Sequence, residues 1–120
     1  MNALNQLENE SAMYHNFNVQ LCLDYGGRDE IIRTINKIIS RGTRKVNEEM
    51  FKNELDTAGI PEPELIIRTS GEKRLSGLMP FQSVYSELYF VDKYFPDFKG
   101  EDLRKAVEEF NKRNRRFGGK

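Results

Sequence analysis

The chain has 120 residues, of which 38% are hydrophobic, and its 19 basic residues balance its 19 acidic ones. This length suits one domain with a modest core, and the zero net charge excludes a global electrostatic attraction for anionic partners. The single cysteine, Cys22, excludes an internal disulfide and a metal site built from several cysteines. Because no apolar run approaches the roughly 20 residues that span a bilayer, we expect a cytoplasmic protein whose membrane contact, if any, is peripheral.

The first 16 residues are polar and predict a lead-in, either frayed or in a short helix. They include the only histidine, His15, which we interpret as a surface residue because no metal-ligating neighbour accompanies it. The pattern changes at residues 17–23, where every second residue is apolar: Phe17, Val19, Leu21 and Leu23. This period of two predicts a β-strand that begins the folded part of the chain.

A helix is expected at residues 28–41. Its isoleucines recur on one helical face, at Ile31, Ile32, Ile35, Ile38 and Ile39. Asp29 and Glu30 suit the first turn, where the helix dipole favours negative charge. The preceding pair, Gly26 and Gly27, predicts a tight turn or a phosphate contact, and the turn is favoured because two glycines alone are a weak phosphate motif. Strand, glycine pair and helix together are the first half of a parallel α/β unit.

The middle of the chain predicts a second helix followed by a buried strand. Asn47 is the expected cap of that helix. Pro61 and Pro63 then favour an extended chain, which leads into residues 65–67, a continuous apolar run typical of a strand covered on both faces. Arg68 falls at the carboxyl end of this strand, where ligands bind in open α/β sheets.

The last part of the chain predicts a short helix within residues 77–85, begun near Pro80, and a helix that starts near Gly100. The second of these has an apolar stripe at Leu103, Ala106, Val107 and Phe110. A basic tail follows it. Taken together, the elements predict an α/β fold with a partial parallel sheet of about three strands, near residues 17–23, 65–68 and 88–91, flanked by helices.

Arg68 and Arg74 follow the buried strand and have the chemistry of an anion site. Guanidinium groups bind phosphate oxygens in pairs, and hydroxyls such as that of Ser76 can satisfy further acceptors. The alternative is that Arg68 pairs with Glu72 and that Arg74 is a solvated charge, since ion pairs within loops are common. Glu87 could hold Mg²⁺ beside a diphosphate, or it could be an ordinary surface or helix-capping residue. The residues alone leave these alternatives open.

Several segments, in consistent order and spacing, resemble one enzyme family. They are Tyr25-Gly26-Gly27-Arg28-Asp29-Glu30-Ile31, Arg68-Thr69-Ser70-Gly71-Glu72-Lys73-Arg74-Leu75-Ser76, Gln82, Tyr85-Ser86-Glu87-Leu88-Tyr89-Phe90, Phe95-Pro96-Asp97-Phe98 and Arg115-Arg116-Phe117-Gly118-Gly119. This pattern resembles the C-terminal half of the cis-prenyltransferases, which include undecaprenyl diphosphate synthase. The resemblance divides the chain into a polar lead-in, residues 1–16, and the C-terminal half of a cis-prenyltransferase-like domain, residues 17–120.

The resemblance implies a transferase of isoprenoid biosynthesis that uses Mg²⁺ to condense isopentenyl diphosphate with an allylic diphosphate into a polyprenyl diphosphate. By position, Arg68, Arg74 and Ser76 would bind the diphosphate of isopentenyl diphosphate, and Glu87 would help to hold Mg²⁺. The run Arg116-Phe117-Gly118 resembles the family's terminal Arg-x-Gly motif. Through that motif, Arg116 and Gly118 would contact substrate phosphate in the site of a neighbouring subunit, as in a homodimer or a heteromer.

The sequence also departs from the family pattern. After the second arginine the family usually has Ser-Asn-Phe, whereas this chain has Ser76-Gly77-Leu78, and Asp24 stands where many members carry Asn. More important, the His-Asp-Gly-Asn motif that supplies the family's catalytic, metal-binding Asp is absent from these 120 residues. No complete catalytic set is therefore expected in this chain, and whether it is itself an enzyme is left open.

Two function hypotheses follow from these observations. In the first, the chain is a cis-polyprenyl diphosphate synthase-like protein, active only when the missing N-terminal half is supplied. In the second, it is a non-catalytic partner subunit of a heteromeric cis-prenyltransferase, to which it lends Arg116. Binding of nucleic acid by the basic tail is not expected, because the tail has no aromatic stacking platform beyond Phe110 and Phe117.

Overall fold

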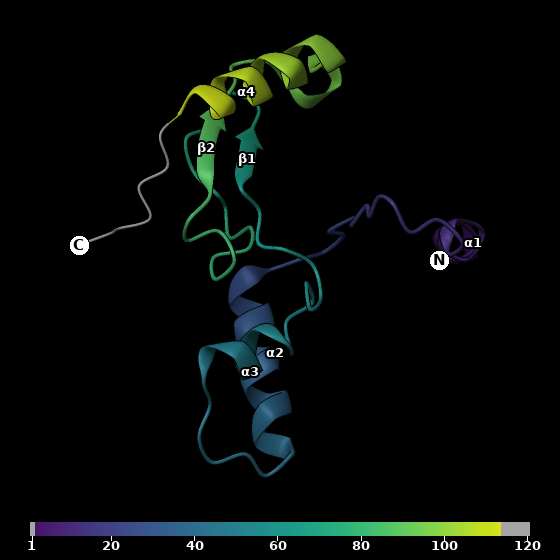
Figure 1. Cartoon of the computed structure of the whole chain (residues 1–120), viewed down its shortest axis with the longest axis vertical. Helices are drawn as coiled ribbons and strands as arrows, with labels where there is room; N and C mark the ends of the chain where they lie inside the picture. The colour runs from purple at the N-terminus through teal and green to yellow at the C-terminus, as the bar shows by residue number, and fades with distance from the viewer. Residues whose placement is uncertain (1, 114–120) are drawn as a thin grey trace.

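The computed structural model describes residues 2–113. In order, its elements are the helices α1 (Asn2–Ser11), α2 (Gly27–Ser40) and α3 (Glu48–Lys52), the strands β1 (Leu65–Arg68) and β2 (Glu87–Phe90), a 3-10 turn (Phe95–Asp97) and the helix α4 (Gly100–Lys112). They form three groups: the sheet with α4, then α2 with α3, and α1 at the end of an extended arm (Figure 1). The radius of gyration, 17.0 Å, exceeds the roughly 14 Å expected for a compact chain of this length. The structure is therefore less compact than a typical globular domain.

The two strands form a parallel sheet in which Leu65 lies opposite Glu87, and Arg68 lies opposite Phe90. Ile66 is the buried residue of β1, as its position in a continuous apolar run predicts. The amide of Val91 continues the ladder by donating to the carbonyl of Arg68 over 2.8 Å. The predicted α/β class with a small parallel sheet is thus confirmed. Because parallel strands point the same way, Arg68 and Glu87 lie at opposite ends of the sheet.

The strand predicted at residues 17–23 does not form in the described part of the chain, where the sheet has two strands. The segment is extended but unpaired, and its alternating apolar side chains are between 63% and 79% exposed. Apolar residues at every second position indicate which face of a segment can be buried. A β-strand also needs a neighbouring strand whose amides and carbonyls form hydrogen bonds with its own. Within residues 2–113 the sheet consists of β1 and β2, so the prediction of about three strands is corrected to two.

Helix α2 forms as predicted, but much of its isoleucine face lies open. Ile38 is 3% exposed, whereas Ile32 and Ile39 are 57% and 59% exposed. The small core is drawn from four separate segments, with Ile38, Leu55, Ile66 and Ala106 as its buried hydrophobic residues. The apolar pattern of α2 therefore extends beyond the surface that α3 covers.

The caps of the remaining helices explain where they begin. The side chain of Asn47 accepts a hydrogen bond from the Met50 amide over 2.8 Å, which confirms it as the cap of α3. At α4, the Asp102 carboxylate accepts from the Lys99 amide over 2.9 Å. Ala106 of this helix is fully buried, and the helix packs against β1. Within residues 2–113, no helix combines the length and apolar character needed to cross a membrane.

The short helix predicted within residues 77–85 is wrong, because this segment forms consecutive turns. Ser76 and Met79 have φ angles of 51° and 41°. A non-glycine residue in this left-handed region cannot continue a right-handed helix. A single bond of helical spacing remains, from the Ser83 amide to the Met79 carbonyl over 2.9 Å. The sequence between β1 and β2 is therefore one long loop, residues 69–86.

Candidate functional site

Arg68 is the last residue of β1, and within residues 2–113 its guanidinium has no ion-pair partner. Its Nε is buried without a hydrogen-bond acceptor, and no carboxylate within residues 2–113 forms an ion pair with it. A buried donor without an acceptor costs about 1–3 kcal/mol. The alternative pairing of Arg68 with Glu72 is wrong, because Glu72 forms its ion pair with Arg74. An anion bound at the carboxyl end of β1 would supply an acceptor for Arg68.

The second predicted arginine, Arg74, lies on the surface of the loop. Its side chain is 63% exposed, and its partner Glu72 is 40% exposed. Exposed ion pairs of this kind contribute about 0–1 kcal/mol. The pair with Glu72 would therefore compete only weakly with a diphosphate, which offers several charged oxygens to the same guanidinium.

The beginning of the loop is fixed to the chain after β2. The amide of Ser70 donates to the Lys93 carbonyl over 2.7 Å, and the amide of Gly71 donates to the Val91 carbonyl over 2.9 Å. Ser70 has a φ of 71°, a conformation that costs a non-glycine residue roughly 1–2 kcal/mol. Since both amides already have acceptors, an anion here would be bound mainly by side chains.

The far part of the loop, which carries Ser76, packs against the start of α2. The amide of Gly27 donates to the Gly77 carbonyl over 3.0 Å. A Cβ on Gly27 would lie 2.1 Å from Cδ of Pro80 and 2.3 Å from the Gly77 carbonyl oxygen. Gly27 is thus required for close packing, and its amide bonds to protein. This favours the tight-turn interpretation of Gly26 and Gly27 over a phosphate contact.

Glu87 is the first residue of β2 and is held by Arg113. Their side chains form an ion pair of 3.0 Å, and Arg113 also pairs with Glu109 over 2.6 Å. These carboxylates, Glu109 first and Glu87 second, raise the pKa of Arg113. No group of three or more metal-ligating side chains occurs within residues 2–113. Glu87 offers one carboxylate, which does not by itself fit a complete Mg²⁺ site.

The predicted site residues are therefore distributed along one loop and are not gathered in a closed pocket. Arg68 marks the carboxyl end of β1, Ser76 lies beside the start of α2, and Glu87 begins β2. Arg116 and Gly118, predicted to contact substrate phosphate, lie outside the described residues.

A buried polar group that the sequence analysis did not predict lies next to this loop. Glu30 is fully buried. It accepts hydrogen bonds from the Tyr25 hydroxyl at 2.5 Å, the Asp56 amide at 2.9 Å and Nε2 of Gln82 at 3.1 and 3.2 Å. Burial raises the pKa of Tyr25 most, and the hydrogen bond to Glu30 raises it further. The backbone of Met79 acts in the opposite direction and lowers this pKa. We call Tyr25, Glu30, Asp56, Thr57 and Gln82 the Glu30 cluster.

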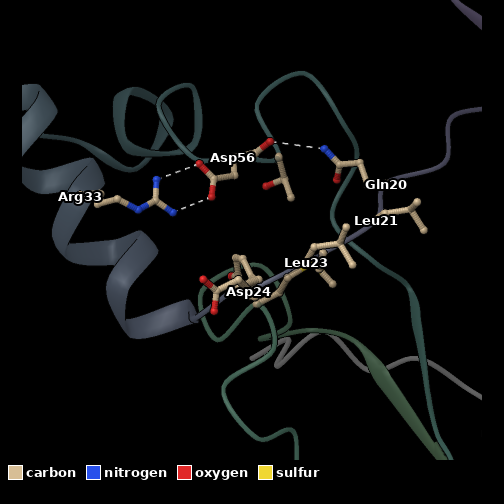
Figure 2. Close-up of a pocket in the computed structure, with 10 residues that line it drawn as sticks. Gln20, Leu21, Leu23, Asp24, Arg33 and Asp56 are labelled. Carbon is tan, nitrogen blue, oxygen red and sulfur yellow. Dashed lines mark hydrogen bonds and ion pairs between the residues drawn. The ribbon is translucent and has the colours of Figure 1, made fainter. Parts of the chain in front are cut away.

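A hollow of about 250 Å³ lies between the extended segment and α2 (Figure 2). Its only cation within the described lining is Arg33, whose guanidinium bonds both carboxylate oxygens of Asp56, at 2.7 and 3.1 Å. This pairing lowers the pKa of Asp56. Because Arg33 is neutralised by Asp56 and also by Asp29, the described lining of the hollow offers no free positive charge to an anion.

Comparisons with known proteins agree with this fold. Residues 1–118 match the family model of undecaprenyl diphosphate synthase. The chain is 42% identical over 118 residues to an isoprenyl transferase of Aquifex aeolicus, covering 98% of this chain and 51% of that protein. Among solved structures, it matches lavandulyl diphosphate synthase from Lavandula x intermedia, in complex with dimethylallyl diphosphate, with a TM-score of 0.90 and 34% identity, covering 98% of this chain and 53% of that one.

A second structural match is a probable undecaprenyl diphosphate synthase from Campylobacter jejuni, with a TM-score of 0.84 and 31% identity. It covers 98% of this chain and 55% of the other. The chain thus spans about half the length of the relatives that it matches. Family model, sequence identity and fold agree, and the chain belongs to the undecaprenyl diphosphate synthase family of cis-prenyltransferases.

Proposed function

We propose that this chain supplies the isopentenyl diphosphate side of a cis-prenyltransferase reaction, in which isopentenyl diphosphate is condensed with an allylic diphosphate. The observation that carries this proposal is the buried Nε of Arg68, at the carboxyl end of β1, which has no hydrogen-bond acceptor within residues 2–113. In a parallel sheet this end is the usual place for a ligand. Family membership then selects a diphosphate among the possible anions.

In this proposal, Arg68 and Arg74 bind the diphosphate oxygens and Ser76 donates a further hydrogen bond. Arg68 needs no displacement to accept an anion, whereas Arg74 exchanges its exposed pair with Glu72 for the ligand. The chemical step requires that charge on a leaving diphosphate be stabilised while the two substrates are held in place. The residues of this chain would hold and orient the isopentenyl substrate for that step.

Mg²⁺ and the second substrate require residues beyond this loop. Glu87 would contribute one ligand to Mg²⁺ after releasing Arg113, and other residues must complete the metal's coordination. Glu87 lies at the opposite end of the sheet from Arg68, so a Mg²⁺ ion that it helps to hold would neutralise diphosphate charge where an assembled site brings the two together. The allylic diphosphate would bind to the complementary half of the family's domain, whichever chain carries it. Arg116 and Gly118 would approach substrate phosphate in a dimer or heteromer.

The alternative role is that of a non-catalytic partner subunit. The exposed isoleucines of α2 and the unpaired segment at 17–23 favour association with another protein surface. In this role the chain would lend Arg116 to the site of a catalytic partner. Replacement of Arg116 by Ala would then reduce the partner's activity while the two proteins still co-purify.

Calorimetric titration of the full 120-residue chain with isopentenyl diphosphate tests the proposed function. We expect saturable binding, stronger than that of isopentenyl monophosphate, because two arginines can bind the additional phosphate group. Glu87→Gln should leave binding without metal unchanged and reduce the gain produced by Mg²⁺. Absence of binding at millimolar diphosphate, or equal affinity for the monophosphate, would contradict the proposal.

A further inference from the structure

Glu30 is an unusual residue in this small core because its carboxylate is fully buried without a basic partner in the described part of the chain. A buried charge is tolerated when hydrogen bonds satisfy it. The hydrogen bonds that it accepts come from Tyr25, the Asp56 amide and Gln82, which are 5, 26 and 52 residues away in sequence. Glu30 therefore joins three separate segments at one point.

One of these segments, that of Gln82, belongs to the loop that carries the proposed diphosphate ligands, and another, that of Tyr25, lies beside it. Gln82 follows Ser76 and Pro80 in the far part of the loop. Tyr25 and Met79 line the same hollow, and the Met79 backbone opposes the rise in the pKa of Tyr25. Together with the bond from the Gly27 amide to the Gly77 carbonyl, these contacts fix the far part of the loop to α2.

The orientation of the Gln82 amide depends on the Glu30 carboxyl group. Nε2 of Gln82 lies 3.1 and 3.2 Å from the two carboxylate oxygens of Glu30 and 3.1 Å from the hydroxyl of Thr57. Its Oε1 is buried without a partner in the described part of the chain. Rotating the amide by half a turn would place this oxygen against the carboxylate, which is repulsive. The carboxylate thus holds Gln82 in one orientation even though one of its polar atoms is unsatisfied.

The first part of the loop has a separate attachment. The amides of Ser70 and Gly71 are bonded to Lys93 and Val91, beyond β2. Arg68 and the beginning of the loop would keep their positions if the Glu30 cluster were lost. Ser76 lies in the other part of the loop, which is attached through the bond between Gly27 and Gly77 and through the contact of Gln82 with Glu30. The loop is therefore fixed at two independent places.

We infer that Glu30, acting through Gln82 and Tyr25, is a positioning residue that sets the far part of loop 69–86, and with it Ser76, relative to Arg68. This inference rests on the proposed function, because it takes the anion bound between Arg68 and Ser76 to be a diphosphate. Glu30 itself does not touch the ligand. Its role is to fix the separation of the two ends of the site.

A reciprocal exchange separates positioning from simple loss of stability. Glu30→Gln leaves the Gln82 amide opposite a second amide, and Gln82→Glu places two carboxylates together. The double variant, Glu30→Gln with Gln82→Glu, restores one carboxylate and one amide at the same place. In it the amide at position 30 can donate both to the carboxylate at position 82 and to the Tyr25 oxygen, while its carbonyl accepts from the Asp56 amide. Glu108→Gln, on the exposed surface of α4, is the matched control.

Amide hydrogen exchange of the full chain, without ligand, is the first measurement. We expect each single variant to accelerate exchange of the Gly27 and Ser83 amides by about tenfold or more while Ser70 and Gly71 change little. The double variant should recover most of the protection, and Glu108→Gln should match the original chain. Equal acceleration at all four amides would show a general loss of stability and overturn the inference, as would no change at Gly27 and Ser83.

Titration with isopentenyl diphosphate is the second measurement. The single variants should bind about three- to tenfold more weakly, with the affinity recovered in the double variant. Weaker binding without recovery, or unchanged binding in the single variants, would overturn the positioning role. If neither the original chain nor any variant binds the diphosphate, the proposed function fails, and the exchange measurement still decides whether Glu30 positions the loop.

Discussion

Residues 17–23 and strand β1 both have the sequence pattern of a strand, yet only β1 forms one. In β1, Ile66 is 7% exposed and every residue lies opposite a partner in β2. In the other segment, Leu21 is 63% exposed and no ladder forms with the described part of the chain. Side-chain periodicity therefore predicts which face a segment can bury, whereas formation of a strand also requires a second strand to pair with.

The same comparison accounts for the open shape of the molecule. Its relatives are about twice as long, and segments that lack neighbours here are those that an additional part of the domain could cover. The apolar side chains of residues 17–23 and several isoleucines of α2 are exposed in this way. Strand β1, by contrast, is paired along its length and ends in Arg68, whose buried Nε has no acceptor within residues 2–113.

Among the variants considered, replacement of Arg68 by Ala should have the strongest effect on binding of isopentenyl diphosphate. We expect the affinity for isopentenyl diphosphate to fall roughly 10- to 100-fold, because a hydrogen bond to a charged group is worth about 1.5–3 kcal/mol. The melting temperature should not fall, since the Arg68 guanidinium has no partner to lose within residues 2–113. Arg104→Ala, on the exposed surface of α4, is the control for titration and thermal melting. A similar loss of affinity in both variants would contradict a specific role for Arg68.

Replacement of Gly27 by Ala tests the packing that positions the far part of the loop. The new Cβ would overlap Pro80 and the Gly77 carbonyl, so we expect a loss of about 1–3 kcal/mol in the free energy of unfolding. Gly26→Ala is the matched control, because its Cβ would lie 3.6 Å from Cβ of Asp29, an ordinary contact. Denaturant titration measures both. Equal stability of the two variants would show that the loop does not pack on Gly27 in solution.

Local patterns in the sequence predicted much of the fold. The isoleucine period of α2, the Asn47 cap and the apolar run of β1 each depend on residues close in sequence. These signals were sufficient because helices and their caps are decided largely by neighbouring residues. The failure of the third strand to form was not predictable in this way, since its ladder requires a partner elsewhere.

The candidate site shows the same limit. The sequence indicates Arg68 because it falls at the carboxyl end of a buried strand, and its Nε has no acceptor within residues 2–113; that it binds an anion stays a prediction. Glu30 was interpreted only as a first-turn acid, because such residues are usually exposed. Its burial depends on Gln82, 52 residues away. A buried polar contact of this kind leaves little local trace in the sequence.

Replacement of Leu21 by Ala would test whether residues 17–23 are a strand without its partner. The binding partner is the part of the Aquifex aeolicus relative that this chain does not match. We expect the affinity of the Leu21→Ala chain for this partner to fall about tenfold, because a buried leucine contributes roughly 1.5–3 kcal/mol. Asn18→Ala, on the other face of the segment, should have little effect. The stability of the chain alone should not change. Equal association of both variants, measured by light scattering, would contradict a strand role.

The smallest expected effect concerns pH. Hydrogen bonds from Lys93 and then from the Lys99 amide lower the pKa of Asp102 in the folded chain. A lowered folded pKa means that this stabilisation is fully present above the unfolded pKa, about 4, and is lost as the pH falls through the folded value. Asp102→Asn should therefore reduce the difference in melting temperature between pH 7 and about pH 3. If the variant and the original chain lose the same stability over this range, Asp102 does not contribute as described.

The central claim is that this chain holds the isopentenyl diphosphate side of a reaction centre that a complementary part must complete. Incorporation of radiolabelled isopentenyl diphosphate into polyprenyl product, with an allylic diphosphate and Mg²⁺, tests it directly. We predict no product from the 120-residue chain alone, and product when the unmatched part of the Aquifex aeolicus relative is added. Product from the chain alone would contradict this account.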